Sequence, residues 1–184
     1  MERNTFSKFC LKLFLRLLGL DICCFITCSF CITSSGSHLV RIFLQAACII
    51  VMIAFVYPVC HQFGDIDAPL VNTGHRKYNP FKGLYAGLVA TLPFILSSLM
   101  LLISKFGGVF PSFVSYYKII NSIFFPFIYS IMPVDYTISE LTLTSVVFSV
   151  LIQAVIPLVC MFAYMLGIER FSFSEKLLYK KKEK

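Results

Sequence analysis

Four residues of the polar stretch 61–82 have side chains that could hold a divalent metal or transfer protons. They follow the pattern H-x3-D-x-D-x7-H and are His61, Asp65, Asp67 and His75. Imidazole and carboxylate groups are ligands of borderline divalent metals, and they also act as general acids and bases. None of the tight spacings typical of zinc sites is present. We therefore favour the competing interpretation, in which this is a polar loop whose side chains face water.

Three basic residues in the same stretch could bind an anion. Arg76, Lys77 and Lys82 come directly before the apolar segment 83–104. If that segment is a helix, its free amides add to a site for a phosphate or a lipid headgroup. Basic residues also flank most membrane spans as interfacial anchors, and this is the interpretation we favour.

Three cysteines form a C-x3-C-x2-C pattern at Cys24, Cys28 and Cys31. Radical enzymes that use S-adenosylmethionine hold an iron–sulfur cluster with this spacing, but in a polar, sheltered loop of a large barrel domain. Here the thiols lie in an apolar, helix-like run of a much shorter chain. We expect a helix with thiols along one side, and no cofactor.

Motifs of the common catalytic sites are absent from the sequence. There is no Ser-His-Asp pattern, G-x-S-x-G, H-E-x-x-H or P-loop. We therefore expect a protein that is not an enzyme.

The composition indicates a protein of the lipid bilayer. Apolar residues make up 58% of the 184 residues and charged residues 14%, whereas soluble domains have about 45–50% and about 25%. The mean hydropathy is +0.84. The net charge of +7 comes mainly from basic residues near the two ends of the chain. This pattern favours contact with anionic lipid and not with nucleic acid.

The hydropathy pattern predicts about four transmembrane helices, at 42–60, 83–104, 112–133 and 146–168. Inside these spans, Gln45 and Gln153 should each form a hydrogen bond with a neighbouring helix. We expect Pro58 to bend or end the first span and Pro93 to kink the second. The small residues Gly83 and Gly87, spaced as G-x3-G, would let two helices approach closely.

The segment 112–133 is the least regular of the four. Lys118 interrupts it and Pro126 lies near its middle, so the uninterrupted apolar part is short for a core of about 30 Å. A thin span, a re-entrant hairpin and an interfacial helix all remain open.

The N-terminal segment 1–38 is rich in cysteine and predicts an amphipathic helix. Its basic residues recur at i, i+4 and i+8 and are Lys8, Lys12 and Arg16. Such a stripe suits a helix that lies in the headgroup plane. Two alternatives are a span over 17–33, which would bury Asp21, and a cleaved signal peptide.

Counting Lys and Arg predicts that both termini are cytoplasmic, with a basic cytoplasmic tail at 169–184. Two topologies leave the same number of basic residues inside. In one, 112–133 spans and the polar loop 61–82 is outside. In the other, 17–33 spans and this loop is inside.

The run from Gly74 to Leu84, GHRKYNPFKGL, resembles a G-x-x-x-x-D-x-x-R-G-L stretch that precedes a G-L-I-A helix. This stretch occurs in small, uncharacterised multi-pass membrane proteins of low-GC Gram-positive bacteria, and AYMLG at 163–167 with SEKL at 174–177 is also similar to theirs. The chain departs from the pattern in its cysteine-rich start and at Asn79 and Lys82, where an acid and Arg are expected. The resemblance implies a helical bundle in a membrane, and it implies no activity and no site residue.

We therefore predict a single, all-α integral membrane domain over 1–184, located in the cell membrane. Its partners would be the lipid bilayer and either a membrane protein or a second copy of the chain. The most favoured function is that of a non-enzymatic membrane or complex-partner protein. The first alternative is a small-molecule transport component, although no charged residue lies deep in the clearest spans. The second alternative is a membrane enzyme that uses the 61–82 loop.

Overall fold

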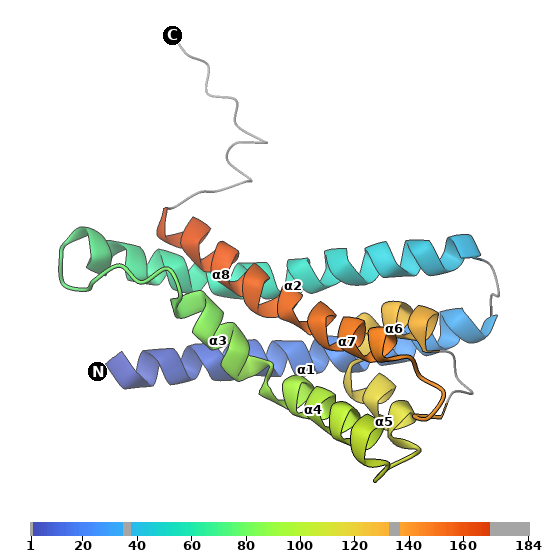
Figure 1. Cartoon of the computed structure of the whole chain (residues 1–184). Helices are drawn as coiled ribbons and strands as arrows, with labels where there is room; N and C mark the ends of the chain where they lie inside the picture. Colours follow the sequence, from blue (N-terminus) through green and yellow to red (C-terminus); the bar gives the residue numbers. More distant parts are fainter. Residues whose placement is uncertain (1, 35–37, 133–136, 170–184) are drawn as a thin grey trace.

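Two long helices lie side by side and antiparallel in the computed structural model, which describes residues 2–34, 38–132 and 137–169. They are α1 (Glu2–Ser34) and α2 (His38–Asn72), coloured blue and cyan to green in Figure 1. Near one end of the pair, Phe9 stacks on Phe63 with 4.3 Å between the ring centroids. Towards the other end, the sulfur atoms of Cys28 and Cys48 are 3.6 Å apart.

Helix α1 buries one face along its length. The buried residues recur every three or four positions and are Phe9, Leu13, Leu17, Leu20, Cys24 and Cys28. The predicted basic stripe lies beside this face, because Lys12 donates to Gln62 Oε1 at 3.0 Å. Arg16 donates to the carbonyl oxygen of Phe55 at 3.4 Å. The outer face is also apolar, with Leu11 and Leu15 largely exposed, as in a helix that contacts lipid.

Helix α2 is longer than the sequence predicts. It continues through Pro58 and Pro69 to Asn72, so the prediction of a polar loop over all of 61–82 is wrong for 61–72. A proline removes one backbone hydrogen bond, and packing of this part of α2 on α8 (Val155–Ile168) keeps the helix continuous. The non-helical connection before the next helix covers only 73–81.

The predicted span 83–104 is a broken helix. It consists of α3 (Lys82–Ala90) and α4 (Leu92–Gly107), which meet at an angle of 60°. The break is at Thr91, whose hydroxyl donates to the carbonyl oxygen of Gly87 at 2.8 Å. Pro93 lies in the first turn of α4, so the predicted kink is confirmed and begins just before the proline.

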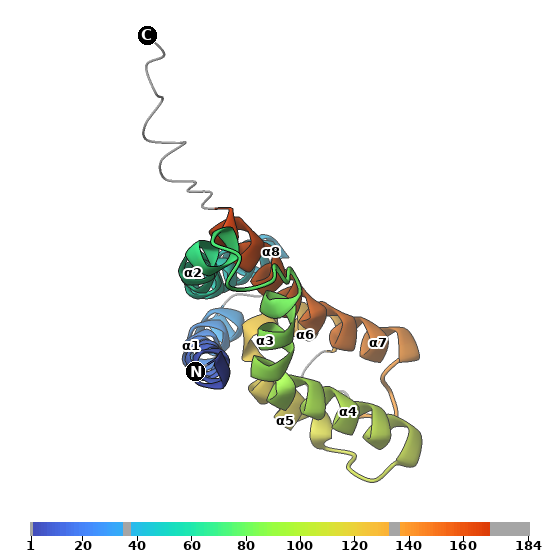
Figure 2. The same cartoon turned by 90° about the vertical axis from the view of Figure 1, so that its left-hand side faces the viewer.

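The prediction of one membrane helix at 112–133 is wrong. The segment divides into α5 (Phe113–Ile120), a 3-10 turn (Ser122–Phe124) and α6 (Phe125–Ile131). The chain changes direction at Asn121, and neither helix is long enough to cross a bilayer. Helix α4 lies away from the α1–α2 pair, on the other side of α3 (Figure 2).

The last predicted span, 146–168, is confirmed as helical and begins earlier. It comprises α7 (Leu143–Leu151), a 3-10 turn (Ile152–Ala154) and α8. Thr142 caps its start by accepting a hydrogen bond from the amide of Ser145 at 3.2 Å. The predicted basic tail at 169–184 lies outside the described residues from 170 onward.

Two helical segments of the described chain are long and apolar enough to cross a membrane, His38–Asn72 and Leu143–Ile168. The bent pair α3–α4 would be a third if it forms one span. Length and composition thus support a membrane protein with two or three such spans.

Glycines bring three of the helices into backbone contact. A Cβ atom at Gly64 would overlap the carbonyl oxygen of Tyr164, and one at Gly167 would overlap that of His61. Likewise, a Cβ atom at Gly83 would overlap the carbonyl oxygen of Cys160. Helix α8 is therefore held directly against α2 and α3, which places Tyr164 of α8 beside Asp67 of α2.

Candidate functional site

Asp67 is the centre of the most highly charged cluster that we find inside the bundle. Only 3% of its surface is exposed. Its Oδ1 atom accepts from Arg76 Nη1 at 2.5 Å, and its Oδ2 atom accepts from Lys82 Nζ and from the Tyr164 hydroxyl, the latter at 2.6 Å. A buried carboxylate is tolerated only when it is paired and hydrogen-bonded. Both oxygens of Asp67 meet this condition.

The turn after α2 brings Arg76 back to Asp67. Gly74 has a positive φ of 73°, a conformation that glycine adopts without steric strain. Its amide donates to the carbonyl oxygen of Val71 at 3.1 Å, and the amide of Arg76 donates to that of Leu70 at 3.0 Å. The chain therefore folds back over the end of α2.

Lys82 reaches the same carboxylate from the first residue of α3. The close approach of Gly83 to Cys160 holds α3 against α8. Lys82 Nζ consequently lies 5.8 Å from the centroid of the Tyr164 ring as well as beside Asp67. Three separate parts of the chain thus meet on one side chain of α2.

Beside this cluster is an open pocket of about 260 Å³. It is lined by the residues Phe6, Arg76, Lys77, Asn79, Lys82 and Tyr164. Asp67 is not among them, but it is paired with two of the lining cations. The three basic residues that the sequence suggests for an anion site thus gather around one cavity.

The residues suggested for a metal or acid–base site are divided between different environments. His61 Nδ1 lies 3.2 Å from Asp65 Oδ2, one helical turn away on α2. Asp67 pairs with the basic residues instead, and His75 is exposed in the turn that follows α2. Within the described ranges, no group of three or more His, Cys, Asp or Glu side chains is arranged to hold a metal ion.

A second polar cluster lies where the shorter helices break. Gln153 donates to Asn121 Oδ1 at 2.7 Å and to the Tyr117 hydroxyl at 3.1 Å. Asn121 in turn donates to Ser97 Oγ at 2.8 Å, and Tyr117 donates to the carbonyl oxygen of Ser149 at 2.9 Å. All five residues are buried. The predicted interhelical hydrogen bond of Gln153 is therefore confirmed.

Gln45 is the other intramembrane glutamine, and its prediction is also confirmed. It donates to Ser130 Oγ at 3.0 Å and to the carbonyl oxygen of Pro126 at 3.3 Å. Both acceptors belong to α6, so Gln45 connects that short helix to α2.

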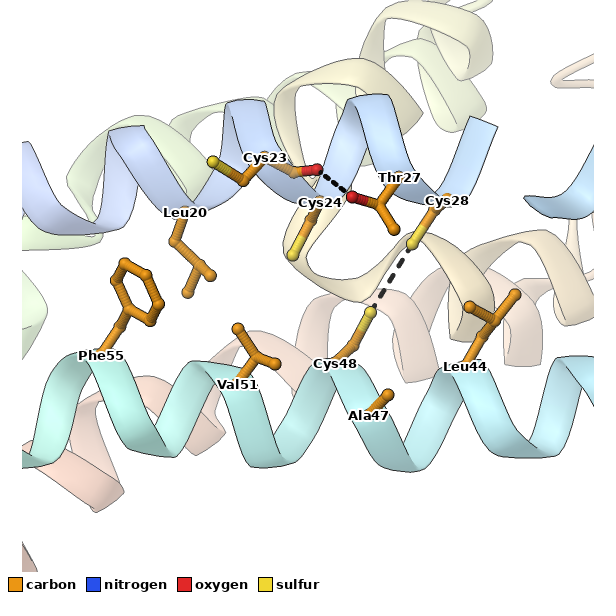
Figure 3. A pocket seen from close by; sticks show the side chains of 10 residues that line it. All are labelled: Leu20, Cys23, Cys24, Thr27, Cys28, Leu44, Ala47, Cys48, Val51 and Phe55. Carbon is orange, nitrogen blue, oxygen red and sulfur yellow. Dashed lines mark hydrogen bonds between the residues drawn. The ribbon is translucent and has the colours of Figure 1, made fainter. Parts of the chain in front are cut away.

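The predicted thiol-lined face of α1 points towards α2. Cys24 and Cys28 line a small apolar crevice of about 200 Å³ together with Cys48 of α2 (Figure 3). The side chain of Cys31 lies outside the described residues. Cys24, Cys28 and Cys48 are free thiols.

Sequence reasoning missed the role of Tyr164 and the pairing of Asp67 with basic residues. Tyr164 is separated from Asp67 by 97 positions, and the packing of α8 on α2, with its close approach at Gly64 and Gly167, brings the two together. A tyrosine three residues before Gly167, near the end of a span, was the available signal.

No family model, curated protein or solved structure matches this chain. The resemblance to multi-pass membrane proteins of Gram-positive bacteria therefore stays a prediction.

Proposed function

We propose that this chain is a non-enzymatic, multi-pass membrane protein that binds its ligand or partner at one polar end. The observation that carries this proposal is the pocket bounded by Arg76, Lys77 and Lys82. The turn 73–81, which carries Arg76 and Lys77, lies at the same end of the bundle as the start of α1 and the end of α8 (Figure 1).

The hydrogen bonding of the polar clusters supports binding over catalysis. Asp67 already accepts from three donors, so it is poorly placed to take a proton from a substrate. Gln153 and Asn121 are likewise bonded to neighbouring helices. These groups stabilise the fold through their hydrogen bonds. We therefore rank a membrane enzyme last among the three candidate functions.

The antiparallel pair α1–α2 supports a specific topology. At 33 residues, α1 is roughly 50 Å long, more than a hydrocarbon core of about 30 Å requires. If α2 crosses the membrane, α1 crosses beside it, as in the interpretation in which 17–33 spans. The crossings would then be α1, α2, α3–α4 and α7–α8, with α5 and α6 not crossing.

In this topology the N-terminal part of α1, the turn 73–81 and the end of α8 share one side. Lys8, Lys12 and the three basic residues of the pocket all belong to this side. The positive-inside rule favours a cytoplasmic location for it.

Cysteine labelling in right-side-out membrane vesicles tests this topology. Asn72→Cys introduces an exposed thiol next to the pocket, and Ser112→Cys introduces one in the turn between α4 and α5. We expect an impermeant maleimide to label Ser112→Cys in sealed vesicles, and Asn72→Cys only after the vesicles are opened. The unmodified chain reports labelling of the native thiols. Labelling of Asn72→Cys in sealed vesicles would contradict the proposed topology.

A transport component is the second candidate, favoured by the discontinuous helices. Polar residues at broken helices form substrate sites in many transporters. Here the polar cluster around Gln153 adjoins a crevice of about 160 Å³ that Ser98 and Gln153 help to line. Proteoliposomes can be tested for uptake of labelled amino acids and sugars. Uptake that exceeds that of empty liposomes and is lost in Gln153→Leu would support this function.

A further inference from the structure

We propose that the pocket lined by Arg76, Lys77, Asn79 and Lys82 binds a phosphate group, and that an anionic lipid headgroup can supply it. This inference rests on the proposed function and names the ligand of the same site. Its argument uses the charge of the pocket, its hydrogen-bond donors, its size and its surroundings.

The charge of the pocket favours an anion. Arg76, Lys77 and Lys82 contribute three positive charges, and Asp67, which pairs with two of them, contributes one negative charge. Three lining cations beside one carboxylate favour an anionic group such as a phosphate monoester, which carries about −1.5 to −2 at neutral pH. Because Asp67 holds Arg76 and Lys82 in place, these cations are positioned before any ligand arrives.

The donors around the pocket suit phosphate oxygens. A guanidinium has five N–H groups and an ammonium has three, so Arg76 and Lys82 can pair with Asp67 and with a ligand at once. Asn79 Oδ1 accepts from the amide of Phe81 at 3.0 Å, which leaves the NH2 group of Asn79 as a donor. Helix α3 begins at Lys82, so the positive end of its dipole lies at the pocket edge.

The volume of the pocket suits a small group, and its opening leaves room for an attached chain. Its volume of about 260 Å³ is below the roughly 300–1,000 Å³ of sites for drug-sized ligands. A phosphate with a short polar attachment is the chemical class that such a small cationic site fits.

Exposed aromatic residues in the turn 73–81 and on α3, the two segments that supply most of the pocket lining, favour a lipid as the source of the phosphate. Tyr78, Phe81 and Tyr85 are 47%, 51% and 53% exposed. Exposed tyrosines gather at the level of the headgroups in membrane proteins. Phe6 of α1 adds an apolar wall against which the upper part of an acyl chain can pack.

Binding is measured with the purified full-length chain in an uncharged maltoside detergent. The probes are dioleoyl phosphatidic acid, which presents a phosphate monoester, dioleoyl phosphatidylcholine as the lipid without net charge, and inorganic phosphate. Native mass spectrometry counts bound lipid, and the shift in melting temperature gives an apparent affinity. We expect phosphatidic acid to bind and phosphatidylcholine not to bind.

Two variants test whether the lipid occupies this pocket. Lys77→Gln removes an exposed lysine without touching Asp67, and we expect roughly fivefold weaker binding of phosphatidic acid. Asn79→Asp keeps the oxygen that accepts from Phe81 and adds a negative charge, so we expect a loss of about tenfold or more. Lys8→Gln is the matched control, because Lys8 is an exposed lysine at the same end that does not line the pocket.

Each result supports or overturns the proposal. Weaker binding in Lys77→Gln and Asn79→Asp with unchanged binding in Lys8→Gln supports it. Competition by millimolar inorganic phosphate would then identify free phosphate as a ligand, and its failure would identify the lipid. Equal losses in Lys8→Gln and Lys77→Gln, or unchanged binding in Asn79→Asp, would overturn it. Lipid binding in detergent does not depend on the side of the membrane on which the pocket lies. The labelling experiment can therefore contradict the proposed topology while the binding result stands, and the reverse.

Discussion

Asp67 can hold the cations of the candidate site in place without contacting a bound ligand itself. Its carboxylate is almost fully buried and bonded to Arg76, Lys82 and Tyr164. The charge is tolerated because two cations and a hydroxyl replace the water that burial removes. Removing the negative charge of Asp67 would leave the cations Arg76 and Lys82 close together without a counter-charge.

We therefore predict that Asp67→Asn lowers the free energy of unfolding by about 3 kcal/mol, near the lower limit for breaking a buried ion pair. The lower limit applies because Arg76 and Lys82 are partly exposed. Thermal unfolding in detergent measures the effect. Asp65→Asn is the control, since the Asp65 side chain is 46% exposed, and its effect should stay within about 0.5 kcal/mol. Equal effects of the two variants would show that the buried ion pairs of Asp67 contribute nothing to the free energy of unfolding.

At the scale of the elements, the contact between α2 and α8 depends on two glycines. Gly64 and Gly167 let the backbones touch, and any side chain at either position would meet backbone atoms that cannot rotate away. This contact also sets the distance between Asp67 and Tyr164. The small-residue spacing at Gly83 and Gly87 serves the same kind of packing within the chain, against α8.

Gly64→Ala should accordingly lower the free energy of unfolding by about 1–3 kcal/mol, the usual effect of overpacking. Gly19→Ala is its matched control, because a Cβ atom at Gly19 of α1 has no neighbour within 4 Å. We expect the control to be neutral or stabilising by up to about 1 kcal/mol, since alanine favours helix. Melting temperatures in the same detergent compare the two. A stable Gly64→Ala would contradict the close approach of α2 and α8.

The sequence predicts some of these elements well and others poorly, for physical reasons. Hydropathy is a local property, so the apolar parts of α2 and α8 were predictable. The helix over 61–72 was not predictable, because its polar residues are typical of a loop. Its packing on α8 depends on residues that are distant in sequence. The three basic residues line one pocket, and the sequence can suggest such a grouping because they are close together in the chain. The linear spacing groups Asp67 with metal or acid–base residues, because it does not reveal that the turn at Gly74 returns Arg76 to Asp67.

At the scale of the whole molecule, the antiparallel arrangement of α1 and α2 determines which loops share an end. Contacts at both ends of the pair define it, through Phe9 with Phe63 and Cys28 with Cys48. This pairing brings the basic start of α1 close to the pocket.

Oxidative cross-linking in native membranes checks this arrangement. With dioxygen as the oxidant and copper phenanthroline as the catalyst, two thiols lose two hydrogens and form one disulfide. We expect a peptide containing Cys48 to become linked to the α1 peptide that contains Cys28 (Figure 3). Cys48→Ser should abolish that linked mass in peptide mass spectrometry. Failure of Cys48 to link to α1 under conditions that oxidise other thiols would contradict the antiparallel pair.

The contact between Gly64 and Gly167 also has a consequence for biogenesis. Helix α8 is synthesised after the other described helices, so the face of α2 that it covers stays uncovered until translation reaches α8. Asp67 can meet Arg76 and Lys82 early, but the Tyr164 hydroxyl arrives only with α8. The charged cluster is therefore complete only once α8 has been made and has packed on the earlier helices.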